Sequence, residues 1–517
     1  MRFLLRYRHY RRFICASTVF IASYLGMSFA AQAETLQEAL ISAYQTNPKL
    51  KAERARVKEA DENYIQARAQ GRLSSGFSAN VEGQVVRTPG ATIFGGGEGH
   101  TITTGIPRTL AVQVIQPIYQ GGRVKALKSQ AKSGIYAARE GLRSAEQDLF
   151  LAVATAYVDV LRDEETAKIR RNDVSVLARQ EQAARDRFDV GEGTLTDIAQ
   201  SETRLAAANI GLAQADAQLA TSRAAYERVV GHAPVDLRTP PRFVLPATLD
   251  EAQKIGLVNN PLLLASEHNV EAAKSSIGVA KAAGKPTFAI NGSLANLRSQ
   301  LSAVGEADAA SITAQLTIPL YSGGANKSRV RQARSAVERL SFEVKDAENA
   351  VKQNITQIWA LLTSARLSLK ASEQQVKAAE VAFEGVTLEQ QVGTRDTLDV
   401  LNAEQELLNA KLSVVNAQRT VNVTTYQLLT VLGAFDADSI QLPVDTYDPE
   451  ANFLSIKDDG LSKLVDKYVP QSLRGKDFQG KNSVERRQEV KSDVQNLDTQ
   501  SEEEIELSPV LNSAPDW

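Results

Sequence analysis

A seven-residue hydrophobic period runs through the segments 195–231 and 397–433 of the chain. In the first of them the large positions are Ile198, Leu205, Leu212, Leu219 and Tyr226, and the small ones three positions later are Ser201, Ala208, Ala215, Ser222 and Val229. Adjacent rows of large and small side chains let helices approach and interlock, so this period predicts coiled coils with a left-handed supercoil.

Helical spacing of apolar residues extends over four more segments. The segments 123–190 and 326–392 predict two very long helices, each about 100 Å at a rise of 1.5 Å per residue. The segments 35–70 and 249–283 predict one amphipathic helix each. These helices alone are also compatible with a soluble coiled-coil rod.

A period of two replaces the helical period in four short segments, 76–87, 109–119, 286–297 and 311–320. In the last of them Ile312, Ala314 and Leu316 alternate with polar residues. The Gly- or polar-rich segments 88–108 and 298–310 are the expected loops that connect the strands of each pair. Strands of about ten residues with one apolar and one polar face suit a tilted strand in a membrane barrel. A strand pair on a soluble core has the same alternation, so the pattern alone leaves both interpretations open.

The chain consists of two copies of one unit. Residues 35–39 read Thr-Leu-Gln-Glu-Ala and residues 248–252 read Thr-Leu-Asp-Glu-Ala, while 117–122 and 319–324 share Pro-x-Tyr-x-Gly-Gly. The matching positions keep their register except for one net deletion, which indicates a duplication. We place repeat 1 at 34–246 and repeat 2 at 247–435, each with the order helix, strand, loop, strand, long helix, turn, helix.

The N-terminus predicts export. Residues 1–33 contain five arginines and no acid, followed by an apolar run and Ala31-Gln32-Ala33, which is the layout of a signal peptide. A retained membrane anchor is the alternative, but the apolar run is shorter than the ~20 residues of a spanning helix. Four strands are too few to close a membrane barrel, so a chain that spans with them must oligomerise.

Composition disfavours several other functions. The single cysteine, Cys15, lies in the signal segment, so we expect neither disulfides nor cysteine-bound metal in the mature chain. Without residues 1–33 acids outnumber bases, and nucleic acid is not an expected partner. Scattered histidines and the lack of a phosphate-binding loop or zinc-ligand spacing predict no enzyme, no metal and no cofactor. The polar segment 436–517 predicts a disordered tail.

The duplicated order, with its Pro-x-Tyr-x-Gly-Gly turns and Val-Gly tips, resembles the TolC family of outer-membrane efflux and type I secretion channels. The resemblance implies a fold dominated by helices with membrane β-structure, in which a long coiled-coil α-helical barrel joins a trimeric 12-stranded β-barrel. It implies a homotrimer in the lipid of the Gram-negative outer membrane, with the helical barrel and the tail in the periplasm.

The same resemblance implies partners and cargo. The trimer would dock to a periplasmic adaptor (membrane fusion protein) and to an inner-membrane transporter of the RND or ABC class. It would export small toxic compounds, secreted proteins or both. The alternatives are a periplasmic coiled-coil adaptor, which should carry one hairpin flanked by compact β domains, and a structural rod without a channel.

The tips between the long and last helices carry the candidate site. Gly191 and Gly393 permit a sharp reversal. Thr194 and Asp396 are N-cap candidates, and Asp197 and Asp399 then lie in the first turn of the helix that follows, where the helix dipole stabilises acids. The resemblance implies that the gate or constriction lies at the positions of Asp399, Arg395, Thr196, Asp197, Asn402 and Gln390.

Two of these positions depart from the pattern that the resemblance implies. Asn402 stands where a second aspartate is usual, and Gln390 where a gate tyrosine is expected. The turn residues Val190, Gly191, Val392 and Gly393 are the expected site of adaptor docking. We predict that Arg395→Ala or Asp197→Ala loosens the closed state.

Overall fold

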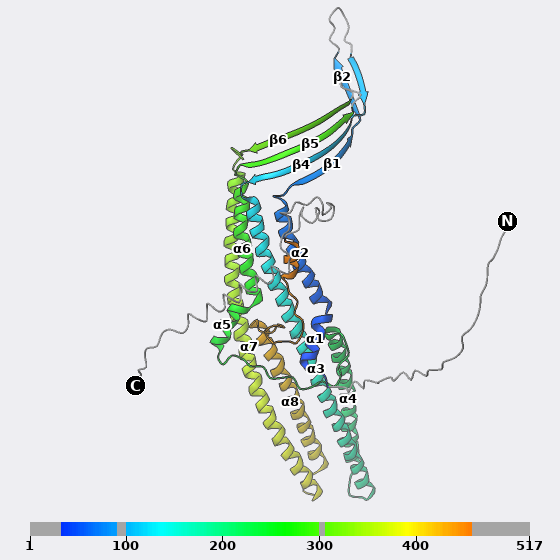
Figure 1. Cartoon of the computed structure of the whole chain (residues 1–517). Coiled ribbons are helices and arrows are strands. Elements are labelled where there is room, and N and C mark those ends of the chain that lie inside the picture. The colour runs from blue at the N-terminus through cyan, green and yellow to red at the C-terminus, as the bar shows by residue number, and fades with distance from the viewer. Residues whose placement is uncertain (1–32, 90–99, 299–305, 458–517) are drawn as a thin grey trace, which may run out of the picture. The chain divides into compact units, whose positions relative to one another are not determined.

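The computed structural model describes residues 33–89, 100–298 and 306–457. The chain divides into two units, Met1–Phe453 and Leu454–Trp517, and the fold described here lies in the first. Within it, helices join one end of a four-stranded sheet (Figure 1). Apart from Ala33, the expected signal peptide lies outside the described residues.

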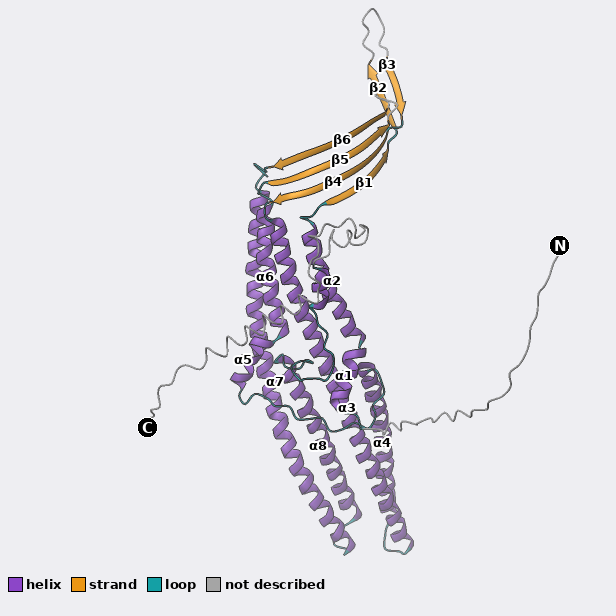
Figure 2. Cartoon of the chain, viewed as in Figure 1, coloured by secondary structure: helices purple, strands orange, loops and turns teal. Residues whose placement is uncertain are grey.

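Two long helical hairpins form the body of this unit (Figure 2). The first joins α3 (Arg123–Asp189) to α4 (Leu195–Val230), and the second joins α7 (Ala325–Gln391) to α8 (Thr397–Val431). The predicted seven-residue rows of α4 are largely buried, including Ile198, Ser201, Ala208, Ala215, Leu219, Ser222 and Tyr226. The long helices and their coiled-coil pairing are therefore as predicted. Among the described helices, none has the length and apolarity required to cross a membrane.

The prediction of a single helix at the start of each repeat is wrong, because the structure has two helices there. α1 (Leu36–Thr46) ends before α2 (Pro48–Ala69), and α5 (Leu249–Asn259) ends before α6 (Pro261–Ala282). Proline has no N–H to donate to the preceding turn and disfavours helical geometry in the residue before it. Asn47 and Asn260 are extended, and their side chains cap the helices that follow.

The sheet is antiparallel with the order β1-β4-β5-β6. Its strands are β1 (Ser74–Val81), β4 (Arg108–Gln120), β5 (Thr287–Arg298) and β6 (Glu306–Thr317). The second and third strands agree closely with the predicted segments, and β6 begins within the predicted loop 298–310. Strands from both repeats pair directly through β4 and β5.

One predicted strand is wrong: the segment 76–87 is interrupted after β1. A second pair, β2 (Gln84–Pro89) and β3 (His100–Gly105), forms its own two-stranded sheet. The break falls at Glu82-Gly83, where β-structure is disfavoured by glycine. Part of the expected loop 88–108 is therefore a strand, and residues 90–99 lie outside the described part.

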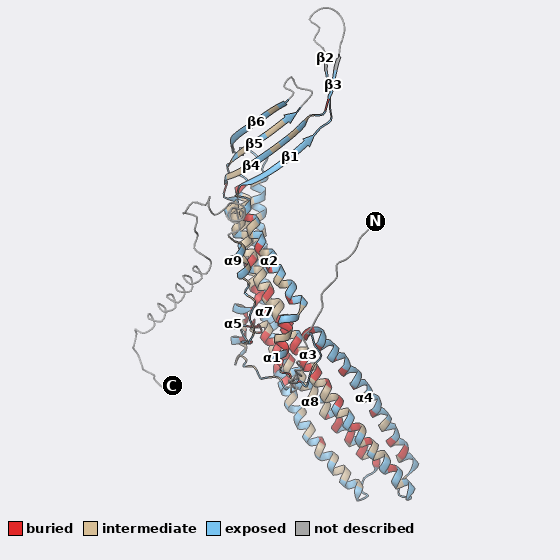
Figure 3. Cartoon of the chain, turned by 45° about the vertical axis from the view of Figure 1, so that its right-hand side comes forward, coloured by how far each residue is buried: buried red, intermediate tan, exposed pale blue. Residues whose placement is uncertain are grey.

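The strand register gathers the predicted apolar rows on one face. Phe77 of β1 is opposite Val112 of β4, and Val112 is opposite Leu294 of β5. Gly292 of β5 is opposite Ile312 of β6. Paired residues share a face of a sheet, and Phe77, Leu294 and Ile312 are all exposed. The sheet thus presents an uncovered apolar face, in contrast to the helices, where buried residues concentrate (Figure 3).

The main core lies where α1, α3, α4 and α8 meet, around Tyr157, Tyr226 and Tyr426. The start of the predicted tail belongs to this core, which corrects its boundary at 436. Ala437 and Leu442 are buried in the cluster, next to Phe435 at the end of repeat 2, and a short helix, α9 (Ala451–Ile456), follows. The composition of this segment predicted disorder, but a contact distant in sequence attaches it to the core. Arg143 of α3 binds the buried Asp436 at 2.7 Å. Residues 458–517 lie outside the described part.

Candidate functional site

The tips of the two hairpins have the same backbone turn. Gly191 and Gly393 adopt φ of +82° and +79°, a conformation that favours glycine. Each glycine N–H closes the turn on the carbonyl three residues earlier, at 2.9 Å. The preceding valines, Val190 and Val392, are 71% and 75% exposed, so each tip presents an exposed valine side chain.

The tip of the first hairpin is held by a reciprocal cap. Thr194 Oγ1 accepts from the N–H of Asp197 at 3.2 Å, and Asp197 Oδ2 accepts from the N–H of Thr194 at 2.9 Å. The Thr194 hydroxyl also donates to Asp197 Oδ2 at 2.8 Å, and this hydrogen bond, together with that from the Thr194 N–H, keeps the pKa of Asp197 below its usual value. The predicted capping role of Thr194 and Asp197 is confirmed. Thr196 is exposed beside them.

The tip of the second hairpin is held by Arg395. Its guanidinium contacts Glu389 of α7 at 3.0 Å and Asp399 of α8 at 3.5 Å. Asp396 caps α8 through the N–H of Asp399 at 2.9 Å, as predicted. Gln390 donates to the hydroxyl of the buried Thr397 at 3.3 Å. These four contacts all lie within one hairpin.

One predicted residue reaches the other hairpin. Asn402 Oδ1 of α8 accepts a hydrogen bond from the guanidinium of Arg204 on α4 at 3.0 Å. Within one chain, Asp399, Arg395 and Gln390 are brought together, but they do not contact Thr196 or Asp197 through any hydrogen bond or ion pair in the described residues. Sequence reasoning missed Arg204, because nothing in its own segment distinguishes it from other arginines on helix surfaces.

Two buried carboxyl groups lie farther along the seam between the hairpins. Asp173 of α3 and Glu404 of α8 are each 7% exposed, and Glu404 Oε2 has no hydrogen-bond partner in the described part of the chain. Burial, together with the Asp173 charge, raises the pKa of Glu404 to about 7, against a smaller opposing effect of Arg179. Leu177 of α3 and Leu401 of α8 pack in a small cluster at the same seam.

The described residues contain no group of side chains that could hold a metal ion. No three His, Cys, Asp or Glu side chains are gathered there as a metal site would require. The site is instead a pair of charged and polar tips whose arrangement can hold two hairpins together or release them.

Comparison with known proteins relates the whole arrangement to one family. The family model described as outer membrane efflux protein matches residues 39–232 and 254–434, and so covers both repeats. The outer membrane efflux protein BepC of Brucella suis biovar 1 is 33% identical over 448 residues, which are 86% of this chain and 95% of BepC.

Two further proteins extend the likeness. The outer membrane protein TolC of Vibrio cholerae serotype O1 is 24% identical over 437 residues, 82% of this chain and 96% of TolC. The solved Campylobacter jejuni CmeC outer membrane channel has a TM-score of 0.66 at 15% identity, covering 82% of this chain and 89% of CmeC. At that identity the structure shows the fold alone. Together, the matches confirm the resemblance and the fold class predicted from the repeat.

Proposed function

The chain belongs to the outer membrane efflux protein family, and we propose that three copies of it form the exit duct of an export machine. The chain is an outer-membrane efflux channel of a Gram-negative cell. The proposal concerns its assembly, its gate and its partners. The observation that carries the proposal is the four-stranded sheet with an exposed apolar face and two free edges.

The free edges support an oligomer, and the family resemblance supports three copies. β1 and β6 each lack a partner strand on one side among the described residues. In lipid, each unpaired backbone group costs several kcal/mol, so a spanning sheet must close on itself. Three sheets joined edge to edge supply a closed barrel of 12 strands, which lies within the known size range of such barrels.

The hairpin tips support a gate at the periplasmic end. Asp399 would occur three times around the narrow end and attract cations, as rings of acids do in channels. Arg395 pairs with it at 3.5 Å and would moderate that field. Arg204 and Asn402 would hold the two hairpins of one protomer closed, in place of the contacts that the family pattern assigns to a tyrosine and a second aspartate.

The exposed tips also support docking. Val190 and Val392 lie bare at the ends of the hairpins, and a periplasmic adaptor would cover them. The adaptor would link the duct to an inner-membrane transporter of the RND or ABC class. BepC is named for efflux, and we propose small toxic compounds as the first cargo class to test, with secreted proteins as the second.

One experiment tests assembly and export together. Purified outer membranes should yield a trimer band that converts to monomer on heating, and deletion of the gene should raise sensitivity to dyes, detergents and antibiotics. A monomer in the soluble periplasmic fraction would refute the duct. An intact trimer whose loss leaves drug sensitivity unchanged and abolishes secretion of a protein would reassign the cargo to secreted proteins.

A further inference from the structure

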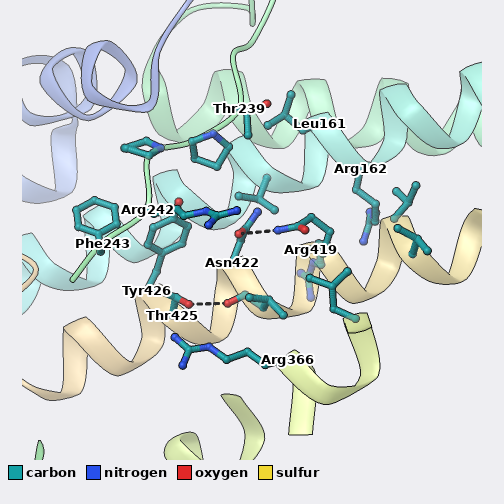
Figure 4. A pocket seen from close by; sticks show the side chains of 18 of the residues that line it. Leu161, Arg162, Thr239, Arg242, Phe243, Arg366, Arg419, Asn422, Thr425 and Tyr426 are labelled. Carbon is teal, nitrogen blue, oxygen red and sulfur yellow. Dashed lines mark hydrogen bonds between the residues drawn. The ribbon is translucent and has the colours of Figure 1, made fainter. Parts of the chain in front are cut away.

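A cavity of about 890 Å³ lies beside the segment that links the two repeats (Figure 4). Its lining comes from α3, α7, α8 and the linker residues 239–245, far from the tip residues in sequence. We call it the linker cavity. Its volume falls within the range of about 300–1,000 Å³ typical of sites for small molecules.

Most of the lining is apolar, and one end of it is fixed by aromatic contacts. Phe243 of the linker packs edge-on against Tyr426 at 5.8 Å and against Phe435 at 6.1 Å between ring centroids. Pro240 and Pro241 restrict the backbone just before it. The linker is thereby held against α8, and the cavity is formed before any ligand arrives.

Four arginines line the cavity, but two of them are already paired. Arg162 binds Asp163 at 2.7 Å, and Arg419 binds Asp159 at 2.8 Å. By contrast, Arg242 and Arg366 form no hydrogen bond or ion pair with any residue that the structure describes. Figure 4 shows Arg242 extending from the linker into the cavity, toward Asn422.

The only acid in the lining does not neutralise these two arginines, because Glu165 binds Lys168 at 3.1 Å. Both arginines are exposed, so the open side of the cavity carries this unpaired positive charge beside the apolar walls. It attracts anions, and its walls favour a ligand whose remaining surface is apolar.

The side chain of Tyr426 adds a donor to the lining, and the residue as a whole is 2% exposed. Its backbone carbonyl accepts from Thr430, whereas its hydroxyl takes part in no hydrogen bond within the described part of the chain. Burial raises the pKa of this phenol, so it keeps its proton and can donate to a ligand oxygen.

We propose that the linker cavity binds a long-chain carboxylate. The carboxylate head lies at Arg242, whose planar guanidinium matches a carboxylate in shape and hydrogen bonding. The hydrocarbon chain lies along the apolar lining, which includes Val158, Leu161, Leu369, Val414 and Val415. Arg366 adds attraction from α7. This site is separate from the gate and does not depend on the proposed gate residues.

The mature chain contains no cysteine, so a single introduced thiol can report on the cavity. Val415→Cys places that thiol in the lining, and Ser413→Cys places one on the exposed surface of the same helix. The mature protein in lipid nanodiscs is treated with a thiol reagent in the presence of dodecanoate or of the neutral dodecanol. We expect dodecanoate to slow modification of Val415→Cys at least fivefold, and dodecanol to have little effect.

Charge variants then locate the head group. Arg242→Gln should raise the half-protecting dodecanoate concentration about tenfold, since it removes a charge-assisted hydrogen bond. Arg366→Gln should raise it less, and Arg238→Gln, a linker arginine outside the lining, should leave it unchanged. Equal protection by dodecanol, protection of Ser413→Cys, or an unchanged concentration in Arg242→Gln would each overturn the proposal.

Discussion

Arg204 on α4 donates a hydrogen bond to Asn402 on α8 at 3.0 Å, and this contact joins the two helical hairpins of one protomer near their tips. Asn402 occupies a position where the family pattern leads one to expect an acid. An amide can accept from the guanidinium without adding a negative charge to the narrow end. The departure from the pattern is therefore matched by an arginine on the facing hairpin.

Removing this contact should loosen the gate. Arg204→Ala is expected to shift the equilibrium toward open channels by about two- to tenfold, because a hydrogen bond of this kind contributes about 0.5–1.5 kcal/mol. Single-channel recording in planar bilayers measures the shift. Arg223→Ala is the matched control, since Arg223 of the same helix binds Glu164 within its own hairpin at 2.8 Å. Equal opening in both variants would contradict a specific role for Arg204.

The reverse change should tighten the gate. Asn402→Asp would replace a neutral acceptor with a charged one opposite Arg204 and so add Coulomb attraction to the existing hydrogen bond. We expect lower open probability in Asn402→Asp than in the natural chain. The double variant Arg204→Ala with Asn402→Asp should lose that gain, and a double variant as closed as Asn402→Asp would rule out the pair as its cause.

Arg395 should control ion selectivity as well as closure. Its guanidinium joins Glu389 to Asp399, so Arg395→Ala frees both carboxylates and releases α7 from α8 at the tip. The expected result is a larger conductance and a stronger preference for cations, seen as a shifted reversal potential in a KCl gradient. Arg339→Ala removes an exposed arginine paired with Glu343 farther along α7, and should change neither.

Glu404 makes the seam between the hairpins sensitive to pH. The pKa of Glu404 is about 7 in the folded chain, above its usual value of 4.5, so between these two pH values the folded state holds a proton that the unfolded state releases. Stability is therefore expected to fall as pH rises from about 4.5 through 7. Glu404→Gln should raise stability above pH 7, by about 1–3 kcal/mol, and have little effect near pH 4.5.

Thermal unfolding of the two proteins across this pH range measures the difference. Glu380→Gln, an exposed carboxylate of α7 near Lys411, serves as the control and should follow the natural chain. A constant difference between Glu404→Gln and the natural chain at every pH would show that titration of Glu404 is not its source.

Two glycines should respond oppositely to alanine. Gly433 has φ of +72°, and an added Cβ would lie 2.2 Å from the carbonyl oxygen of Asn259, so Gly433→Ala should be strongly destabilising. Gly385 lies in the interior of α7 with no atom within 4 Å of such a Cβ. Gly385→Ala should stabilise the chain by about 0.5–1 kcal/mol. Heat-induced loss of the folded band on gels ranks the two variants against the natural chain.

The elements that sequence predicted correctly are those in which a regular period runs over many residues. The row of Ile198, Leu205, Leu212 and Leu219 indicates a helix with one buried side, whichever element packs against that side. The alternation around Ile312 likewise indicates a strand with one apolar and one polar face. Breaks at Asn47-Pro48 and at Glu82-Gly83 were missed because the period continues on both sides of them.

The burial of Ala437 and Leu442 was missed for a different reason. The segment from 436 onward has no long period, and its partners are Arg143 of α3 and the core cluster that also contains Tyr426. Its composition resembles that of a disordered chain, yet a few apolar side chains suffice to attach it to an existing core. No local pattern indicates whether such a core lies within reach.

By itself, the sequence determined the duplicated order of helices and strands, the caps at Thr194 and Asp396, and the turns at the tip glycines, because each depends on residues within a few positions of one another. Only the tertiary structure decided that Asn402 meets Arg204, 198 positions away, and that Arg242 and Arg366 line one cavity without an ion-pair partner among the residues described. Such contacts depend on how one hairpin packs against the other, and that packing is the sum of many weak interactions that no single segment contains.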